Sequence, residues 1–176
     1  MQQGKDSILL VQSTSAALGA DGYVIGNSTE HSHSMENELV DENTKFGRVL
    51  GYGQTTESFE ITAYGDTKDP GQKALLDGIR LKKQVKLWEV DLNLNENGMH
   101  NTLFAIVLIE SVEKSAPQDG FVEVSSTVQV IGNSVEGEIP ALPQEMIEFA
   151  QYGFEAPGES TGEFEGIVEP ATPVIP

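Results

Sequence analysis

The sequence predicts a mainly β protein, in which two packed antiparallel sheets form a sandwich-like barrel with one flanking α-helix. Short apolar segments typical of strands recur through the first three quarters of the chain, separated by turn signals rich in Gly, Asn and Asp. Only one segment, near 69–82, combines capping residues with helical apolar spacing. With 176 residues, the chain is long enough for one domain with its own core.

The first third of the chain contains three strand candidates, at 7–12, 23–26 and 32–40. The first is rich in Ile, Leu and Val, whereas the third is mostly polar and suits an exposed or edge position. Segment 41–54 holds three glycines and is interpreted as a long loop, although its centre is unusually apolar for a solvated loop. Segment 58–64 alternates polar and apolar residues, as a half-buried strand does.

The helix is expected to begin at Asp69. Asp69 can cap the helix, Pro70 suits its first position, and Gln72 occupies the place where a capping box has Glu or Gln. Lys82 and Lys83 lie near the expected C-terminus, where the helix dipole favours cations. The apolar stripe consists of Leu75, Leu76 and Ile79.

Two strands follow the helix, at 84–92 and 99–114, and the turn signal Asn97-Gly98 separates them. The second is apolar on both faces from 103 to 109, which predicts a central position in a sheet. Segment 121–131 predicts a further strand, with Val on one face and mostly polar residues on the other.

We predict a β-rich core domain over 1–135 and an acidic arm rich in Gly and Pro over 136–176. Residues 135–138 are interpreted as a turn or short hairpin, and 143–152 as a helical turn. From 153 onward the chain has too few large apolar residues to form its own core. We therefore expect the chain after Gly132 to lack partners within its own copy.

The charge distribution excludes several functions. The chain carries 28 acidic and 10 basic residues, a net charge of −18, and no Lys or Arg follows Lys114. Nucleic-acid binding needs cations that displace counterions from phosphates, and anionic membrane surfaces attract basic segments, so neither partner fits. The absence of cysteine excludes disulfides and thiolate sites. No apolar run reaches bilayer length, and the N-terminus lacks the apolar core of a secretion signal.

Three clusters could form sites, and each has a simpler interpretation. His31 and His33 share a strand face and could supply half of a metal site, or could lie on an exposed polar strand. Segment 91–95 begins like a calcium loop, but Glu96 and Thr102 replace the Gly and Glu that such a loop requires. The basic cluster at 80–86 could bind nucleic acid or face an acidic neighbour. No signature of a catalytic nucleophile, phosphate loop or zinc protease is present, so we expect no enzyme and no cofactor.

Several segments, in order along the chain, resemble one family. Segment 39–51 is similar to the long inter-strand loop of major tail tube proteins from long, non-contractile phage tails. Segments 64–65, 69–74 and 85–91 look like that family's strand, helix and following strand. The family's last core strand and C-terminal arm are similar to segments 128–132, 137–139 and 142–145 and to the acidic stretch 157–163.

This resemblance implies a structural subunit of a phage tail tube, with two steeply packed sheets and one helix. Copies would form hexameric rings that stack around the tape-measure protein and leave an acidic channel for DNA, which passes without tight binding. Further partners would be the tail terminator and distal tail proteins, but no membrane. The subunit would be assembled in the host cytoplasm and reside in the virion tail.

The resemblance and the apolar pattern together suggest assembly residues. For the contact between subunits they are Phe46, Arg48, Val49 and Leu50. For the arm that joins rings they are Leu142, Met146, Ile147, Tyr152 and Phe154. The candidate carboxylates of the channel wall, chosen from strand alternation, are Glu57, Glu60, Glu110 and Glu123.

The alternative to a tube subunit is a calcium-dependent extracellular adhesion domain or a carbohydrate-binding β-domain. It depends on the acidity of the chain and on the oxygen ligands at alternate positions of 91–95.

Overall fold

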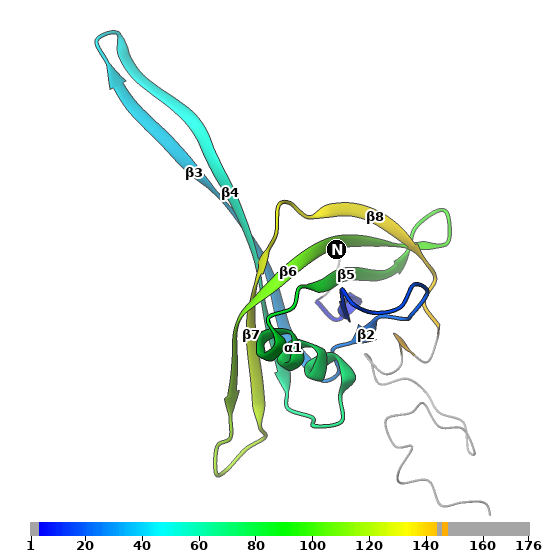
Figure 1. The fold of residues 1–176 in the computed structure, drawn as a ribbon. Coiled ribbons are helices and arrows are strands. Elements are labelled where there is room, and N and C mark those ends of the chain that lie inside the picture. Colours follow the sequence, from blue (N-terminus) through cyan, green and yellow to red (C-terminus); the bar gives the residue numbers. More distant parts are fainter. Residues whose placement is uncertain (1–3, 144–145, 148–176) are drawn as a thin grey trace, which may run out of the picture.

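A computed structural model describes residues 4–143 and 146–147 of the chain (Figure 1). It has one 3₁₀ turn, η1 (Gly4–Asp6), and one α-helix, α1 (Pro70–Leu81), within this part of the chain. The strands are β1 (Ser7–Ser13), β2 (Tyr23–Val24), β3 (Ser28–Thr44), β4 (Gly47–Tyr64), β5 (Val85–Leu94), β6 (Met99–Ser115), β7 (Glu123–Val130) and β8 (Val135–Pro140). The prediction of a mainly β fold with one helix is therefore confirmed.

The strands form one antiparallel sheet of eight strands rather than two separate sheets. Its order is β2-β1-β5-β6-β7-β4-β3, and β8 pairs with β6 beside this path. β6 joins the two halves: residues up to Val107 pair with β5 and β8, whereas residues from Val107 onward pair with β7. A register shift between Ile109 and Ser111 marks the bend, because a bulge kinks a strand and increases its twist.

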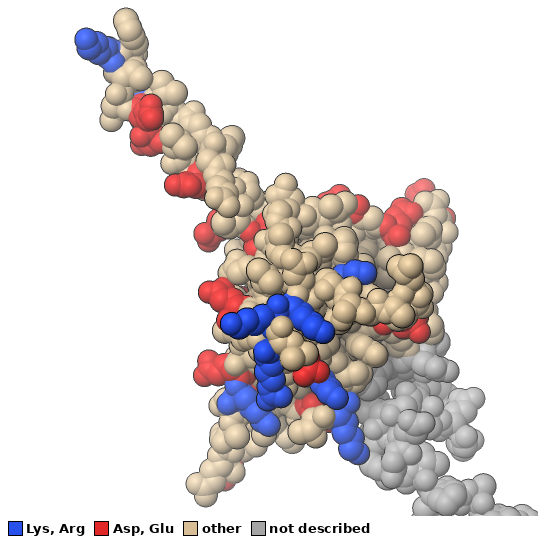
Figure 2. All heavy atoms as spheres, in the orientation of Figure 1, with Lys and Arg blue, Asp and Glu red and all other residues tan. Residues whose placement is uncertain are grey.

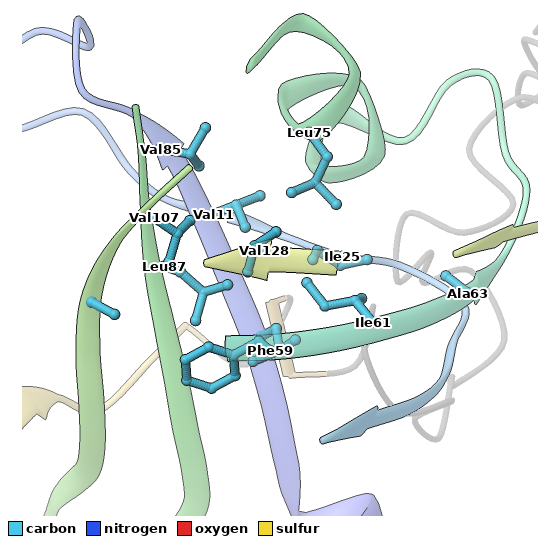
Figure 3. Packing of buried hydrophobic residues seen from close by; sticks show 12 residues of the cluster. Val11, Ile25, Phe59, Ile61, Ala63, Leu75, Val85, Leu87, Val107 and Val128 are labelled. Atoms are coloured by element: carbon cyan, nitrogen blue, oxygen red, sulfur yellow. The ribbon is translucent and has the colours of Figure 1, made fainter. Parts of the chain in front are cut away.

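The main core lies between the two halves of the bent sheet and under α1 (Figure 3). Phe59 and Ile61 from β4 and Val128 from β7 meet Leu87 from β5 there, and Leu75 of α1 covers them. All five side chains are at most 2% exposed. The apolar alternation at 58–64 therefore predicted the buried face of β4 correctly.

A second, smaller cluster lies on the opposite face of the β1–β5 half. It is formed by Ile8, Leu10, Val24 and Val90, and the side chains packed against it are Trp88, Leu92, Ile139, Leu142 and Met146. Three of these come from the chain beyond Gly132. The expectation that this region lacks partners in its own copy is therefore wrong for β8, which pairs with β6, and for Leu142 and Met146. The proposed boundary at 135/136 stays a prediction.

The helix begins as expected, but Gln72 does not complete a capping box. The Asp69 carboxylate accepts the Gln72 N–H at 2.9 Å and the Gly26 N–H at 2.6 Å. The Gln72 side chain instead donates to the Tyr64 carbonyl at 2.8 Å and accepts the Asp66 N–H at 3.0 Å. Both residues therefore bind the neighbouring strands to the helix N-terminus, and burial raises the pKa of Asp69 despite these hydrogen bonds.

Candidate assembly surfaces

The most prominent surface is a long hairpin that leaves the body of the molecule (Figure 1). The expected loop at 41–54 is wrong: β3 and β4 continue to pair until Thr44 opposite Gly47, and only Lys45 and Phe46 form the turn. Because β4 pairs with β7 only from Ser58 onward, the segment 35–57, here called the hairpin arm, has no third strand. An isolated two-stranded hairpin is at best marginally stable in water, so the arm needs a partner.

The hairpin arm carries large apolar side chains that its own copy does not bury. The exposed ones are Met35, Leu39, Val40, Phe46, Val49, Leu50 and Tyr52. Phe46 at the tip is fully exposed, at 100%. The Arg48 guanidinium donates to both carboxylate oxygens of Asp41, at 2.9 and 2.7 Å, and this pair braces the two strands beside the tip. All four residues predicted for a contact between subunits therefore lie at or next to the tip.

A polar sheet face forms the second surface. In the half-sheet of β6, β7, β4 and β3, one face packs into the main core. The opposite face carries the residues that alternate along each strand with the buried ones. Carboxylates on this polar sheet face are Glu30, Glu60, Glu110, Glu113 and Glu123, all exposed. Their neighbours are mostly Ser, Thr and Gln, and Gln129 donates to Glu110 at 2.6 Å. The register places no Lys or Arg there among residues 28–34, 58–64, 108–113 and 123–130.

Three of the four carboxylates predicted for a channel wall share this polar sheet face, and Glu57 does not. Glu57 is in phase with Phe59 along β4, so its side chain points to the core side and is only 4% exposed. It accepts the Ser134 N–H at 3.1 Å. Sequence reasoning also missed Glu30, which lies before the predicted strand 32–40. It missed Glu113 as well, because Glu113 and Glu110 share a face only through the register shift between Ile109 and Ser111.

Two histidine–carboxylate pairs lie at the base of the hairpin arm, and the first connects it to the body. The His31 Nε2 lies 3.2 Å from Glu89 Oε1 and 3.2 Å from the Ser7 hydroxyl, which joins β3 to β5 and β1. The hydrogen bond from His31 lowers the pKa of Glu89, against the effect of burial. His33 stacks on Phe59 with ring centroids 4.4 Å apart, and its Nε2 lies 3.6 Å from Glu57.

The candidate metal sites are used structurally. His31 and His33 do share a face, but each lies beside a carboxylate of another element. Asp91 accepts hydrogen bonds from Asn93, and Asn95 accepts the backbone N–H groups of Asn97 and Met99, so these oxygens shape the β5–β6 turn. Across residues 4–143 and 146–147, no group of three or more His, Cys, Asp and Glu could hold a metal ion.

The residues predicted for an arm between rings divide into two groups. Leu142 and Met146 pack on the second cluster of their own copy, and Ile147 ends the described chain in a short helical turn after Pro143. Tyr152 and Phe154 lie outside the described residues. In the described part of the chain, no helix is both long enough and apolar enough to cross a membrane.

Several of the basic residues gather around α1, on the side of the molecule seen in Figure 2, apart from those at the tip of the hairpin arm. Lys73, Arg80, Lys82 and Lys83 are all exposed, and none has an ion-pair partner among the described residues. The sequence cluster at 80–86 therefore extends to Lys73, seven residues before Arg80, which is two helical turns away on the same side. That spacing was the signal by which Lys73 could have been found.

Comparisons with known proteins converge on one kind of protein. The family model described as phage tail tube protein matches residues 1–136. The tail tube protein gp17.1 of Bacillus phage SPP1 is 43% identical over 167 residues, which is 94% of this chain; the chain spans 63% of that relative's length.

The solved structures agree in fold. A structure of the tail tube of SPP1 superimposes with a TM-score of 0.75 and 40% identity, covering 92% of this chain and 95% of that one. The tail of an empty gene transfer agent particle has the same fold, with a TM-score of 0.62 at 16% identity, covering 77% of this chain and 98% of that one.

Proposed function

Because the chain belongs to the phage tail tube protein family, we propose that its copies form hexameric rings, which stack into a tube around the tape-measure protein. The family membership confirms the resemblance inferred from the sequence, and the family is structural rather than enzymatic. The similar SPP1 chain was solved as a tail tube, which supports assembly of this chain with itself in a virion tail.

The observation that carries this proposal is the hairpin arm. Seven large apolar side chains lie exposed on two strands that have no third strand and no core. Monomeric proteins rarely expose contiguous apolar surface of this kind, and such a surface marks an interaction site. In a stack of rings, the arm of one subunit buries these side chains against the next ring, so that assembly supplies the missing partner.

Open strand edges supply the contacts within a ring. The half-sheet of β6, β7, β4 and β3 ends at β3 on one side, and at the part of β6 beyond Val107 on the other. Unpaired edges are templates for pairing with another chain. Pairing of β3 from one copy with β6 of the next continues this half-sheet around the ring and leaves neither of its two edges free.

The polar sheet face then becomes the wall of the channel. Its five glutamates and the absence of Lys and Arg from its described register give a wall that repels phosphates. Duplex DNA carries about one negative charge per 1.7 Å, so a basic wall would hold it, whereas an acidic wall lets it slide. The tail terminator and distal tail proteins would bind the two ends of such a tube.

The absence of cysteine allows a direct test of this arrangement. A cysteine at Glu60 on the polar sheet face and another at Lys68, exposed before α1, are each labelled with a bulky maleimide before and after assembly. Both variants should react alike as monomers. In tubes seen by electron microscopy, the variant at position 60 should be protected and the variant at 68 should stay reactive.

Two results would contradict the proposal. Full reactivity of position 60 in intact tubes would show that the polar sheet face does not line the channel. Concentrated protein that yields only monomers, both alone and with a tape-measure fragment, would count against the tube itself.

A further inference from the structure

We propose that the basic side of α1 forms a groove that binds the acidic segment 163–169 of a neighbouring copy; this inference rests on the proposed tube and names a contact within it. The groove has a volume of about 410 Å³ and lies between α1 and the ends of β1, β2 and β5. Tyr23, Ala74, Leu81 and Val85 supply its apolar lining. Tyr23 is 48% and Leu81 60% exposed, so the groove leaves apolar surface uncovered.

Positive charge borders this apolar lining. Lys73 and Lys83 line the groove, Arg80 and Lys82 lie beside it on α1 and its C-cap, and Asp77 is the one acidic residue in the lining. These four cations have no ion-pair partner in the described part of the chain. They are also four of only ten basic residues in a chain of net charge −18. The groove therefore fits a partner that combines carboxylates with large apolar side chains.

The chain contains such a partner outside the described residues. Residues 148–176 hold six glutamates and no Lys or Arg. Within them, 163–169 reads Glu-Phe-Glu-Gly-Ile-Val-Glu, which places Phe164 between two glutamates. Phe164 matches the apolar lining of the groove, and the flexible side chains of Lys73 and Lys83 at its border can pair with the glutamates on either side of Phe164.

The exit of the described chain favours a neighbouring copy as the source. Met146 packs against the second cluster, on the face of the sheet opposite the core that α1 covers. The sixteen residues 148–163 can span about 50 Å when extended, which is enough to carry 163–169 beyond the body of its own copy to a neighbouring subunit in the stack.

A charge-reversal experiment on the full-length chain tests the contact. The double variant Lys73→Glu/Lys83→Glu and the triple variant Glu163→Lys/Glu165→Lys/Glu169→Lys should each raise the concentration needed for tube assembly about tenfold. Combining all five changes should restore assembly to within about threefold of the wild type, because the pairs form again with inverted signs. Lys68→Glu, which makes the same charge change outside the groove, should assemble normally.

The outcomes separate this inference from the proposed tube. Wild-type tubes, with both reversed variants assembling at the wild-type concentration, would overturn the groove contact alone. A five-fold variant no better than its parents would also overturn it. Failure of the wild type to assemble under every condition would contradict the tube and this contact together. Equal melting temperatures of all variants would show that the effects come from assembly and not from unfolding.

Photo-crosslinking identifies the partner of the segment. A benzophenone amino acid at Phe164 should cross-link to peptides of α1, and in tubes mixed from heavy- and light-isotope protein the products should join heavy to light chains. Cross-links to other elements would overturn the groove as the binding site. Exclusively heavy–heavy and light–light products would overturn the assignment to a neighbouring copy.

Discussion

Removal of the Phe46 side chain separates assembly from folding. Phe46 is 100% exposed at the tip of the hairpin arm, so Phe46→Ala removes no buried contact from the subunit. The unfolding free energy should change by less than about 0.5 kcal/mol, and the melting temperature by less than about 2 °C. If the ring above buries this side chain, its loss costs about 1.5–3 kcal/mol per contact. Since 1.4 kcal/mol is tenfold, the critical concentration for assembly should rise about 10- to 100-fold.

The assay is sedimentation of tubes across a concentration series, with melting curves of the unassembled protein. Phe46→Leu keeps a large apolar side chain and should assemble close to the wild-type concentration. Phe59→Ala is the contrasting change, because Phe59 is 0% exposed and its truncation should cost about 3–5 kcal/mol of stability. If Phe46→Ala forms tubes at the wild-type concentration, the tip does not bury this side chain and the reasoning fails.

Three further predictions concern the subunit itself. Asp69→Ala should lower the unfolding free energy by about 2–4 kcal/mol in chemical denaturation, because it removes the helix cap and leaves the Gly26 N–H without its acceptor. The control is Asp66→Ala, at an exposed position. Equal stabilities of the two variants would contradict the role of the cap. Gly71→Ala should lower the unfolding free energy by about 1–3 kcal/mol, because the new methyl group would collide with the Val24 carbonyl. Gly51→Ala, whose methyl group would meet no atom within 4 Å, should leave stability nearly unchanged. A Gly71→Ala protein as stable as the wild type would contradict the close packing. The folded-state pKa of Glu89 is lowered, so its ionised form stabilises the fold above the usual Glu pKa, and this contribution is lost as pH falls through the lowered value. In melting curves across the acid range, the melting temperature of the wild type should therefore fall more steeply with pH than that of Glu89→Gln. A parallel fall in both proteins would contradict the His31–Glu89 interaction.

The local features of this fold could be read from the sequence because they depend on neighbouring residues. Alternation along 58–64 predicted the buried face of β4, and Asp69-Pro70 predicted where α1 begins. The long apolar stretch at 103–109 predicted a central strand, and β6 does pair on both edges. These patterns repeat every two or about four residues, so no knowledge of distant contacts is needed.

The hairpin arm was misread because its residues do not follow a burial pattern. Glycines and polar residues in 41–54 indicated a loop, yet β3 and β4 stay paired up to Thr44 and Gly47. Alternation in a strand reflects one buried face, and residues 35–56 of the arm bury neither face in their own copy; only Glu57, at the base, is buried. In the proposed tube, the apolar side chains of the arm pack against another subunit. A prediction rule based on the core of one chain therefore missed its two strands.

The sequence alone determined the helix, most of the core strands, the excess of negative charge and the family resemblance, because composition and short-range spacing carry them. Only the tertiary structure decided that Glu60, Glu110 and Glu123 share one face while Glu57 is buried, and that His31 meets Glu89 across 58 positions. These relations depend on strand register, and a shift of one residue would move each side chain to the other face. Register is decided by the packing of the whole sheet, which no single segment encodes.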